Sequence, residues 1–475
     1  MAWLILGLAW TFANPPFAAP DEADHYVRAY GVGQGHLVGS VAPGVTRGEN
    51  AAERAWVAQT IRKVNMPAGL DPTPFSYVAN PTVPAGYLNS ARPSPTPSQV
   101  ATGVGTYQPL PYVVPGLAEH LGHQPVAADR FGRAANLLVT LVLLAIALYA
   151  MADALIGVVA AVTPTVVFLA ASVTDSSFEI AAGIAFVASL LRLSRDEHPS
   201  ARMRLLTAVS GCALALSRAP GPLWIAIALV IVAALVGVRP LVRELGQWPI
   251  VALVVAVALN RVWEAEYGAT VPYSLHLHSE LSAGVHAYGS AAPTMIAGFG
   301  YLEWHLPVWV YGLWAALVAG VVGFALRYGR RRERLVLSGA VLGGIVLPPL
   351  FWIVVLSRTG FGLQGRHILP IMVAIPLLAA EILRRRGRAM PWIWVWTSVA
   401  GLVQFAAFFF NARRAAVGTQ GPIDFFGHAA WRPPGGWATW LVLAAAGSVL
   451  LAVGPGALRA RLSADPRLRK VSGEV

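Results

Sequence analysis

The chain has 475 residues, of which 56% are hydrophobic and only 12% are charged, with a mean hydropathy of +0.58. This composition excludes an ordinary soluble globular protein and indicates a polytopic membrane protein. The 35 Lys and Arg residues outnumber the 23 Asp and Glu residues, and the single cysteine, Cys212, excludes an intrachain disulfide.

Apolar stretches recur along the chain, and a helix needs about 20 such residues to cross roughly 30 Å of hydrocarbon. We therefore expect an all-α integral membrane protein with about twelve transmembrane helices in one domain, residues 1–475. The first span would reach only about 20 Å, so we expect either a natural start upstream of Met1 or a signal peptide cleaved near Ala19. The expected spans are Met1–Ala13, Phe131–Ala150, Ala154–Val173, Phe178–Leu193, Leu205–Ser217, Pro222–Val238, Trp248–Trp263, Leu306–Leu326, Leu335–Leu356, Ile368–Leu383, Pro391–Phe410 and Trp437–Val453.

The basic residues give an independent test of this topology, because short cytoplasmic loops collect Lys and Arg. With the amino terminus inside, the inner segments hold more than half of the basic residues, at Arg192–Arg204, Arg239–Arg243, Arg327–Arg334, Arg384–Arg388 and Arg459–Lys470. The net charge of +12 is then explained by orientation in the lipid bilayer and contact with anionic headgroups. Nucleic acid is not an expected partner.

The predicted outer side carries nearly all of the extramembrane mass. A large first extracytoplasmic loop is expected over 14–130, a second over 264–305 and a third over 411–436. Within the first loop, short juxtamembrane helices are expected at 49–64 and 110–121, and the Pro- and Gly-rich stretch 68–115 is expected to be irregular. Because the inner loops are too short to hold a site, the chemistry is expected on the outer side.

Three carboxylates crowd just beyond the first apolar segment, in the run Asp21-Glu22-Ala23-Asp24-His25-Tyr26. Pro15, Pro16 and Pro20 stop any helix before them, which places these acids at the lipid–water boundary. They suit either the base of a membrane enzyme or the cap of a helix that starts at Ala23. Asp21 is expected to be extended because it follows Pro20.

The run Pro15–Tyr30, with Gly35-His36-Leu37 after it, resembles the opening of an uncharacterised family of bacterial multi-spanning membrane proteins. Tyr107–Tyr112, Arg130–Asn136 and Gln364–Pro370 resemble later segments of the same family, which more often has Tyr where His367 stands. That family is similar in layout to the GT-C superfamily of glycosyltransferases. These integral enzymes take a sugar from a polyprenyl-phosphate donor and keep an acidic pair in the first outer loop.

The resemblance implies a GT-C-like protein of the bacterial plasma membrane that glycosylates a cell-envelope glycan, lipid or protein on the extracytoplasmic side. An inverting transfer to a hydroxyl needs a carboxylate to accept the proton and no protein nucleophile. Asp21 is the expected base, and Glu22 is its close competitor, orienting the acceptor or a metal. Asp24 and His25 are expected to lie next to these two acids and to support them without contacting the substrate.

The departing phosphate needs a cation, and Arg offers a fixed bidentate fork. Arg366 lies in an expected outer loop with Gly360, Gly362 and Gly365. It is expected to bind the donor phosphate, assisted by Arg358 and His367, or else to anchor its helix at the interface.

Two further clusters leave alternatives open. Asp175 and Glu179, one helical turn apart, either line a polar cavity or, for Asp175, cap the fourth span. Potential metal ligands without a known geometry occur at His276, His278, Glu280 and His286. Whether a divalent cation is a cofactor therefore stays open.

The alternative functions are a flippase or secondary transporter of lipid-linked saccharides and a non-catalytic envelope-assembly protein. A transporter calls for ionisable groups near the middle of the membrane, which are scarce in this sequence.

Overall fold

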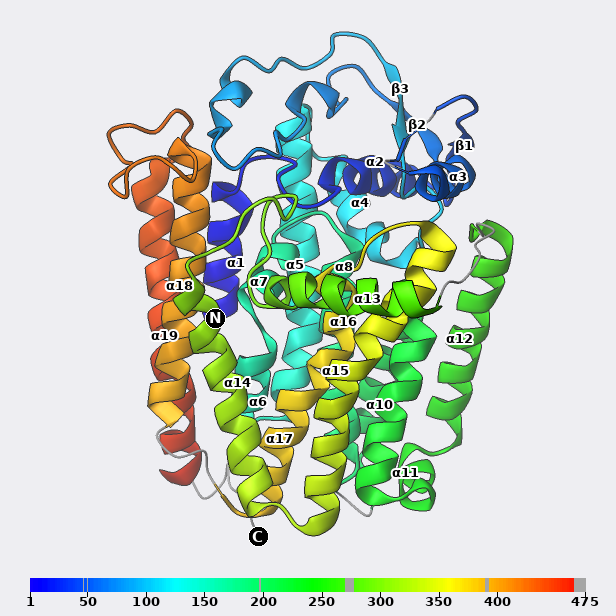
Figure 1. Cartoon of the computed structure of the whole chain (residues 1–475), viewed down its shortest axis with the longest axis vertical. Helices are drawn as coiled ribbons and strands as arrows, with labels where there is room; N and C mark the ends of the chain where they lie inside the picture. Colours follow the sequence, from blue (N-terminus) through cyan, green and yellow to red (C-terminus); the bar gives the residue numbers. More distant parts are fainter. Residues whose placement is uncertain (46, 49, 196–197, 270–276, 389–392, 465–475) are drawn as a thin grey trace.

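The computed structural model describes the chain apart from residues 46, 49, 196–197, 270–276, 389–392 and 465–475. Most of its long helices run side by side between two ends of the molecule (Figure 1). One end carries three short strands and is called the sheet end. The opposite end, called the arginine end, carries the turn between α14 and α15 and the last turn of α17, where Arg330 and Arg385 lie.

Eight helices in the described part of the chain are long and apolar enough to cross a membrane, so the protein is a multi-pass membrane protein. A ninth span arises if α10 (Gly221–Val236) and α11 (Val238–Leu245) are taken together, although they bend by 116°. Gly237, between them, has a φ of +106°, which glycine adopts at little cost. The eight are α5 (Pro125–Ala150), α8 (Asp175–Leu193), α12 (Gln247–Tyr267), α14 (Val308–Tyr328), α15 (Arg331–Thr359), α16 (Gly365–Met372) with α17 (Ala374–Arg385), α18 (Ile393–Val417) and α19 (Gly436–Ala464).

The expected count of twelve full spans is not confirmed, because three of the expected segments form short helices. The helix α1 (Ala2–Ala13) has 12 residues and lies in the half of the molecule nearest the sheet end (Figure 1). The segment 154–173 divides into α6 (Leu155–Ala161) and α7 (Pro164–Ala170), since Thr163 caps a new helix by accepting a hydrogen bond from the Val166 amide. The helix α9 (Ala201–Ala215) has 15 residues.

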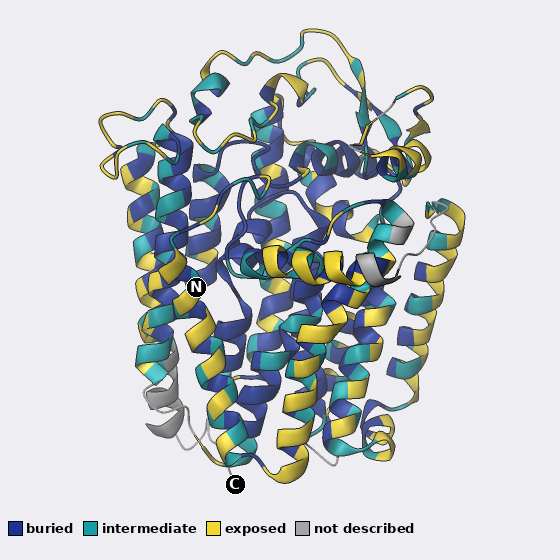
Figure 2. Ribbon diagram, in the orientation of Figure 1, coloured by how far each residue is buried: buried dark blue, intermediate teal, exposed yellow. Residues whose placement is uncertain are grey.

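The centre of the bundle is α8, which Figure 2 shows as almost wholly buried. The helices α5, α9, α16 and α17 all pack against α8. Small residues on α8 allow these neighbours to approach closely. Gly183 faces the carbonyl of Pro370 so closely that a Cβ would overlap it. This contact fixes α16 against α8 and brings the amino-terminal ends of both helices to the same level.

The sheet end is built from the segment between α1 and α5. Helices α2 (Glu22–Gly33) and α4 (Val113–Glu119) cross at Gly116, whose added Cβ would overlap the carbonyl of Ala29. A three-stranded antiparallel sheet lies beside α2 and α3 (Ala51–Thr60), with Val64 opposite Val100. Its strands are β1 (Ser40–Val41), β2 (Arg62–Met66) and β3 (Ser98–Thr102), and single turns lie at η1 (Thr73–Phe75), η2 (Ala85–Asn89) and η3 (Leu110–Tyr112).

The sheet corrects two local expectations. The helix expected over 49–64 ends at Thr60, and the chain then enters β2. The stretch 68–115, expected to be irregular, contains β3. In the second expected outer loop, α13 (Leu277–Ala291) and η4 (Ala292–Met295) lie across α15, where the Tyr288 hydroxyl donates to the Gly344 carbonyl at 2.8 Å (Figure 1).

Candidate functional site

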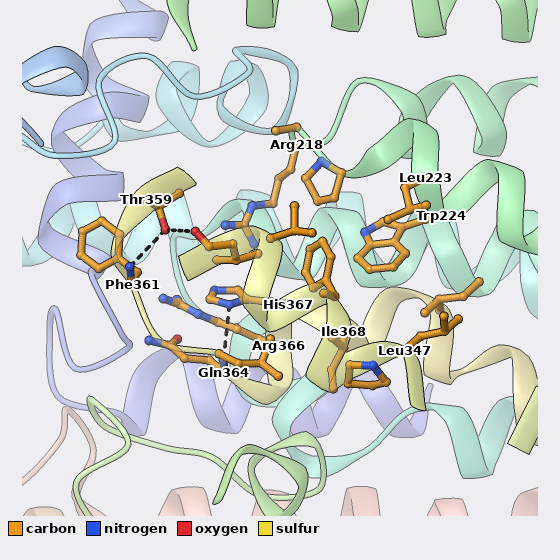
Figure 3. A pocket seen from close by; sticks show the side chains of 18 of the residues that line it. Arg218, Leu223, Trp224, Leu347, Thr359, Phe361, Gln364, Arg366, His367 and Ile368 are labelled. Atoms are coloured by element: carbon orange, nitrogen blue, oxygen red, sulfur yellow. Dashed lines mark hydrogen bonds between the residues drawn. The ribbon is translucent and has the colours of Figure 1, made fainter. Parts of the chain in front are cut away.

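A cavity of about 1560 Å³ lies between α2 and α3 on one side and α10, α15 and α16 on the other. Its part nearest the sheet end, called the cavity head, is lined by charged and polar side chains. The remainder, called the apolar groove, runs between α10 and α15. Figure 3 shows the transition, with Arg218, His367 and Arg366 on one side and Leu223, Trp224 and Leu347 on the other. The charged and imidazole groups of the head include Asp21, Asp24, His25, Arg47, Asp175, Arg218, Arg366 and His367.

Asp21 and Arg366, 345 residues apart in the sequence, form an ion pair in the cavity head. The Nη2 of Arg366 donates to Oδ2 of Asp21 at 2.7 Å, and its Nη1 donates to the Pro20 carbonyl at 3.2 Å. The Asp21 side chain is 50% exposed and lines the cavity, whereas that of Arg366 is 9% exposed. Burial raises the pKa of the Asp21 carboxyl, but the charge of Arg366, assisted by His25 and the Arg366 hydrogen bond, holds that pKa below its ordinary value. Asp21 is therefore ionised at neutral pH.

The backbone of Asp21 differs from the expected extended conformation. Its φ is +60° and its ψ is 15°, in the left-handed region that Asp and Asn visit more readily than most residues. Proline restricts its own φ and the residue before it, so Pro20 does not make Asp21 extended. Asp21 stands at the N-cap position of α2, but its side chain makes no capping hydrogen bond. The side chain faces Arg366 instead of the helix.

Glu22 points away from the cavity and is fully buried. Its Oε1 accepts from Nε of Arg133 at 2.8 Å and its Oε2 accepts from Nη2 at 2.6 Å. The amides of Ala19 and Val173 also donate to this carboxylate. These contacts occupy both oxygens, so the expectation that Glu22 orients an acceptor or a metal has no geometric support. Glu22 instead joins α2 to α5 and to the start of α8.

Asp24 and His25 both line the cavity behind Asp21. Asp24 accepts from Arg47 at 3.1 Å and from the Gly103 amide at 2.9 Å, which holds the β3 end against α2. Nδ1 of His25 lies 2.7 Å from the Tyr112 hydroxyl. Burial lowers the pKa of the His25 imidazole, although the charges of Asp175 and Asp21 oppose this effect. A neutral imidazole follows.

Arg218, in the turn between α9 and α10, faces both acids of the first turns of α8. Its Nε is 3.1 Å from Oδ2 of Asp175 and its Nη1 is 3.6 Å from Oε2 of Glu179. Of the two roles left open for Asp175, the structure supports the first, since Asp175 lines the cavity and the cap of α8 is Thr174, whose hydroxyl accepts from the Ser176 amide. Glu179 lies deeper and accepts from the Trp224 indole at 2.9 Å.

The remaining expected groups are placed as follows. His367 lines the cavity, and its Nδ1 accepts a 3.4 Å hydrogen bond from the Gln364 amide (Figure 3). His276 and the side chains of His278 and Arg358 lie outside the described part of the chain. Across the described part of the chain, no group of three or more His, Cys, Asp and Glu side chains is placed to hold a metal ion.

Sequence reasoning missed Arg218 and Arg133. Both carry a positive charge near the end of the membrane domain opposite the arginine clusters, where the charge rule disfavours Arg. An arginine kept at that end against the rule is a signal that could have identified both residues. Arg47, in a segment without helical or strand periodicity, offered no such signal.

The chain belongs to a family described as predicted membrane protein (DUF2142), whose model matches residues 4–375. This confirms the expected membership of an uncharacterised family of multi-spanning membrane proteins. No curated protein and no solved structure matches the chain.

Proposed function

We propose that this member of the DUF2142 family is a membrane glycosyltransferase that transfers a sugar from a polyprenyl-phosphate donor to a cell-envelope glycan, lipid or protein. The observation that carries the proposal is the continuity of one cavity, which joins a charged head to a long apolar groove. A substrate that fills both parts is an amphiphile with a polar, ionic head and a hydrocarbon tail.

The groove has the length and the opening that a lipid tail requires. Its lining on α10 extends from Leu223 to Ala234, about 16 Å at 1.5 Å per residue. Val230 of α10 and Leu335 of α15 line it and are 67% and 64% exposed, so the groove is open to the surroundings at these residues. Because that surface faces lipid in a membrane, the groove opens sideways to the bilayer and a lipid-linked donor can enter between α10 and α15.

The head supplies the groups that the reaction needs. The hydroxyl oxygen of the acceptor attacks the anomeric carbon of the donor sugar, and the bond from that carbon to the phosphate oxygen breaks. The electron pair leaves with the polyprenyl phosphate, and Asp21 accepts the hydroxyl proton. Attack from the face opposite the phosphate inverts the anomeric configuration. Arg366 positions the Asp21 carboxylate.

The proposal extends to architecture and location. The eight or nine spanning helices in the described part of the chain, together with the short helices α1, α6, α7 and α9, form a GT-C-like membrane domain, and the first extracytoplasmic loop carries the base. The sheet end faces the extracytoplasmic side of a bacterial plasma membrane, because the arginine clusters collect at the other end.

A matched pair of glycine variants tests the proposal. Gly339 on α15 lines the groove, Gly323 on α14 does not, and at both sites an added Cβ meets no atom within 4 Å. Gly339→Leu is expected to lower both donor affinity and transfer at least about tenfold by filling the groove, while Gly323→Leu, with the same gain in helix propensity, leaves both unchanged. Transfer is measured with purified protein, radiolabelled polyprenyl-phosphate sugars and envelope acceptors. Equal donor binding by the two variants would contradict the groove assignment, and binding without transfer by the wild type would favour a flippase.

A further inference from the structure

We infer that Arg218, rather than Arg366, is the residue that binds the phosphate of the lipid-linked donor. The inference rests on the proposed function, and it changes the residue that the sequence assigned to this role. It follows from a comparison of the two guanidinium groups, since only one of them has an N–H donor that a ligand in the cavity can use.

Arg366 is already engaged by the protein. One of its terminal nitrogens donates to Asp21 and the other to the Pro20 carbonyl, and the side chain is only 9% exposed. Its Nε has no hydrogen-bond partner, but this atom is buried, so it offers no donor at the cavity surface. A phosphate that took these donors would release the carboxylate that Arg366 positions. The two roles therefore compete, and the observed contacts favour positioning.

Arg218 is held in place but is not saturated. Its Nε and Nη1 face Asp175 and Glu179, and the two carboxylate oxygens that face it have no hydrogen-bond partner. Its Nη2 makes no hydrogen bond to the described residues, and the guanidinium lies over the Tyr107 ring, 5.7 Å from the ring centre. The two acids thus fix the plane of the guanidinium, and a fixed guanidinium loses little freedom when it binds a phosphate oxygen.

The surroundings of Arg218 place it where a lipid headgroup would stop. It lies at the boundary between the head and the groove, with Leu223 and Trp224 following it in the first turn of α10 (Figure 3). The Trp224 ring lies 5.2 Å from the Phe351 ring of α15 across the groove. The amino terminus of α10 adds a positive partial charge at this point. A phosphate at Arg218 would have its tail in the groove and its sugar toward Asp21.

The test compares farnesyl phosphate with farnesol, which have the same tail and differ in the phosphate. Binding to the detergent-purified full chain is measured for the wild type and for Arg218→Gln, Arg366→Gln and Arg239→Gln, the last being an exposed arginine on α11. A charged hydrogen bond to phosphate predicts that the wild type prefers the phosphate by about 10- to 100-fold. Arg218→Gln is expected to remove most of this preference while the farnesol affinity stays the same. Arg366→Gln and Arg239→Gln are expected to keep the preference to within about threefold.

Each outcome discriminates. A full phosphate preference in Arg218→Gln, or its loss in Arg366→Gln alone, would overturn the assignment while leaving the proposed function standing. A wild type that does not prefer the phosphate would overturn both. Displacement of farnesyl phosphate by an equal concentration of inorganic phosphate would assign the site to free phosphate instead of a lipid. Because Arg218→Gln leaves two acids without their cation, Arg218→Gln with Asp175→Asn serves as a second variant, and it is expected to lose the same preference.

Discussion

The adjacent acids Asp21 and Glu22 should respond in opposite ways when each is replaced by its amide. Asp21→Asn keeps the size of the side chain and suits the left-handed backbone, since Asn adopts it about as readily as Asp. The Asp21 side chain is half-exposed, so loss of its ion pair is expected to cost about 1 kcal/mol or less in unfolding free energy. Removal of the base is expected to slow transfer by about 10² to 10⁴, a barrier increase of about 3–5 kcal/mol.

Glu22→Gln removes the charge from a pair that is fully buried, with two contacts to Arg133 at 2.6 and 2.8 Å. Breaking such a pair typically costs about 3–5 kcal/mol, because the partner charge stays buried. We therefore expect a large loss of stability and yield, with transfer per folded molecule close to that of the wild type. The same one-atom change thus affects chemistry at one position and folding at the next.

The assay measures transfer per folded molecule and thermal unfolding in detergent for the two variants side by side. Near-wild-type transfer by Asp21→Asn would refute the assignment of the base. A Glu22→Gln protein that melts normally but does not transfer would show that the two roles are reversed.

Three further predictions concern the charge of Arg366, the orientation in the membrane and the crossing of α2 and α4. Arg366→Gln removes the charge that lowers the pKa of Asp21 and leaves burial to raise it, so the acid limb of the transfer rate should move to higher pH; an unchanged pH profile would contradict this. In intact cells, cysteine at exposed Thr96 should react with an impermeant maleimide and cysteine at exposed Arg330 should not, and the reverse pattern would invert the proposed orientation. Gly116→Ala should lower the unfolding free energy by about 1–3 kcal/mol, because its Cβ overlaps the α2 backbone, and an unchanged melting temperature would show that the crossing can widen.

The sequence predicted the long spans because their apolar stretches exceed the thickness of the bilayer. It failed where a short motif divides an apolar run. The segment 154–173 reads as one span by hydropathy, yet Thr163-Pro164 starts a second helix within it, as cap and first residue. A window average does not register such a boundary. The sheet was not predicted from the sequence, because β2 and β3 are stabilised by pairing across more than 30 residues and not by a local sequence pattern.

Asp21 and Arg366 were assigned to one site from the family resemblance and the chemistry of the transfer, and the structure places them in contact. In the sequence, Asp21 ranked above Glu22 only because Asp21 follows Pro20, and that position does not decide which carboxylate faces the cavity. Their difference comes from Arg133, which lies 111 residues from Glu22 and takes that carboxylate into the core. Roles that depend on a distant partner are not encoded in a local run of acids.

Of the four segments that carry the family resemblance, Pro15–Tyr30 contains the start of α2, and the other three contact that segment, which gives their common presence a physical meaning. The stretch Tyr107–Tyr112 reaches α2 twice, through the carbonyl of Tyr107 on Arg28 at 2.6 Å and through the hydroxyl of Tyr112 on His25 at 2.7 Å. Arg130–Asn136 reaches it through Arg133 and Glu22, and Gln364–Pro370 through Arg366 and Asp21.

These contacts hold α2 from separate sides and leave Asp21, at its N-cap, facing the cavity beside Asp24. Glu22 is drawn into the core by Arg133, and the chain must then turn at Asp21, whose φ is +60°. Arg366 meets the carboxylate that this turn presents. The strained residue is thus placed by its neighbours, as expected when the position of a functional side chain is fixed by surrounding structure and not by its own conformational preference.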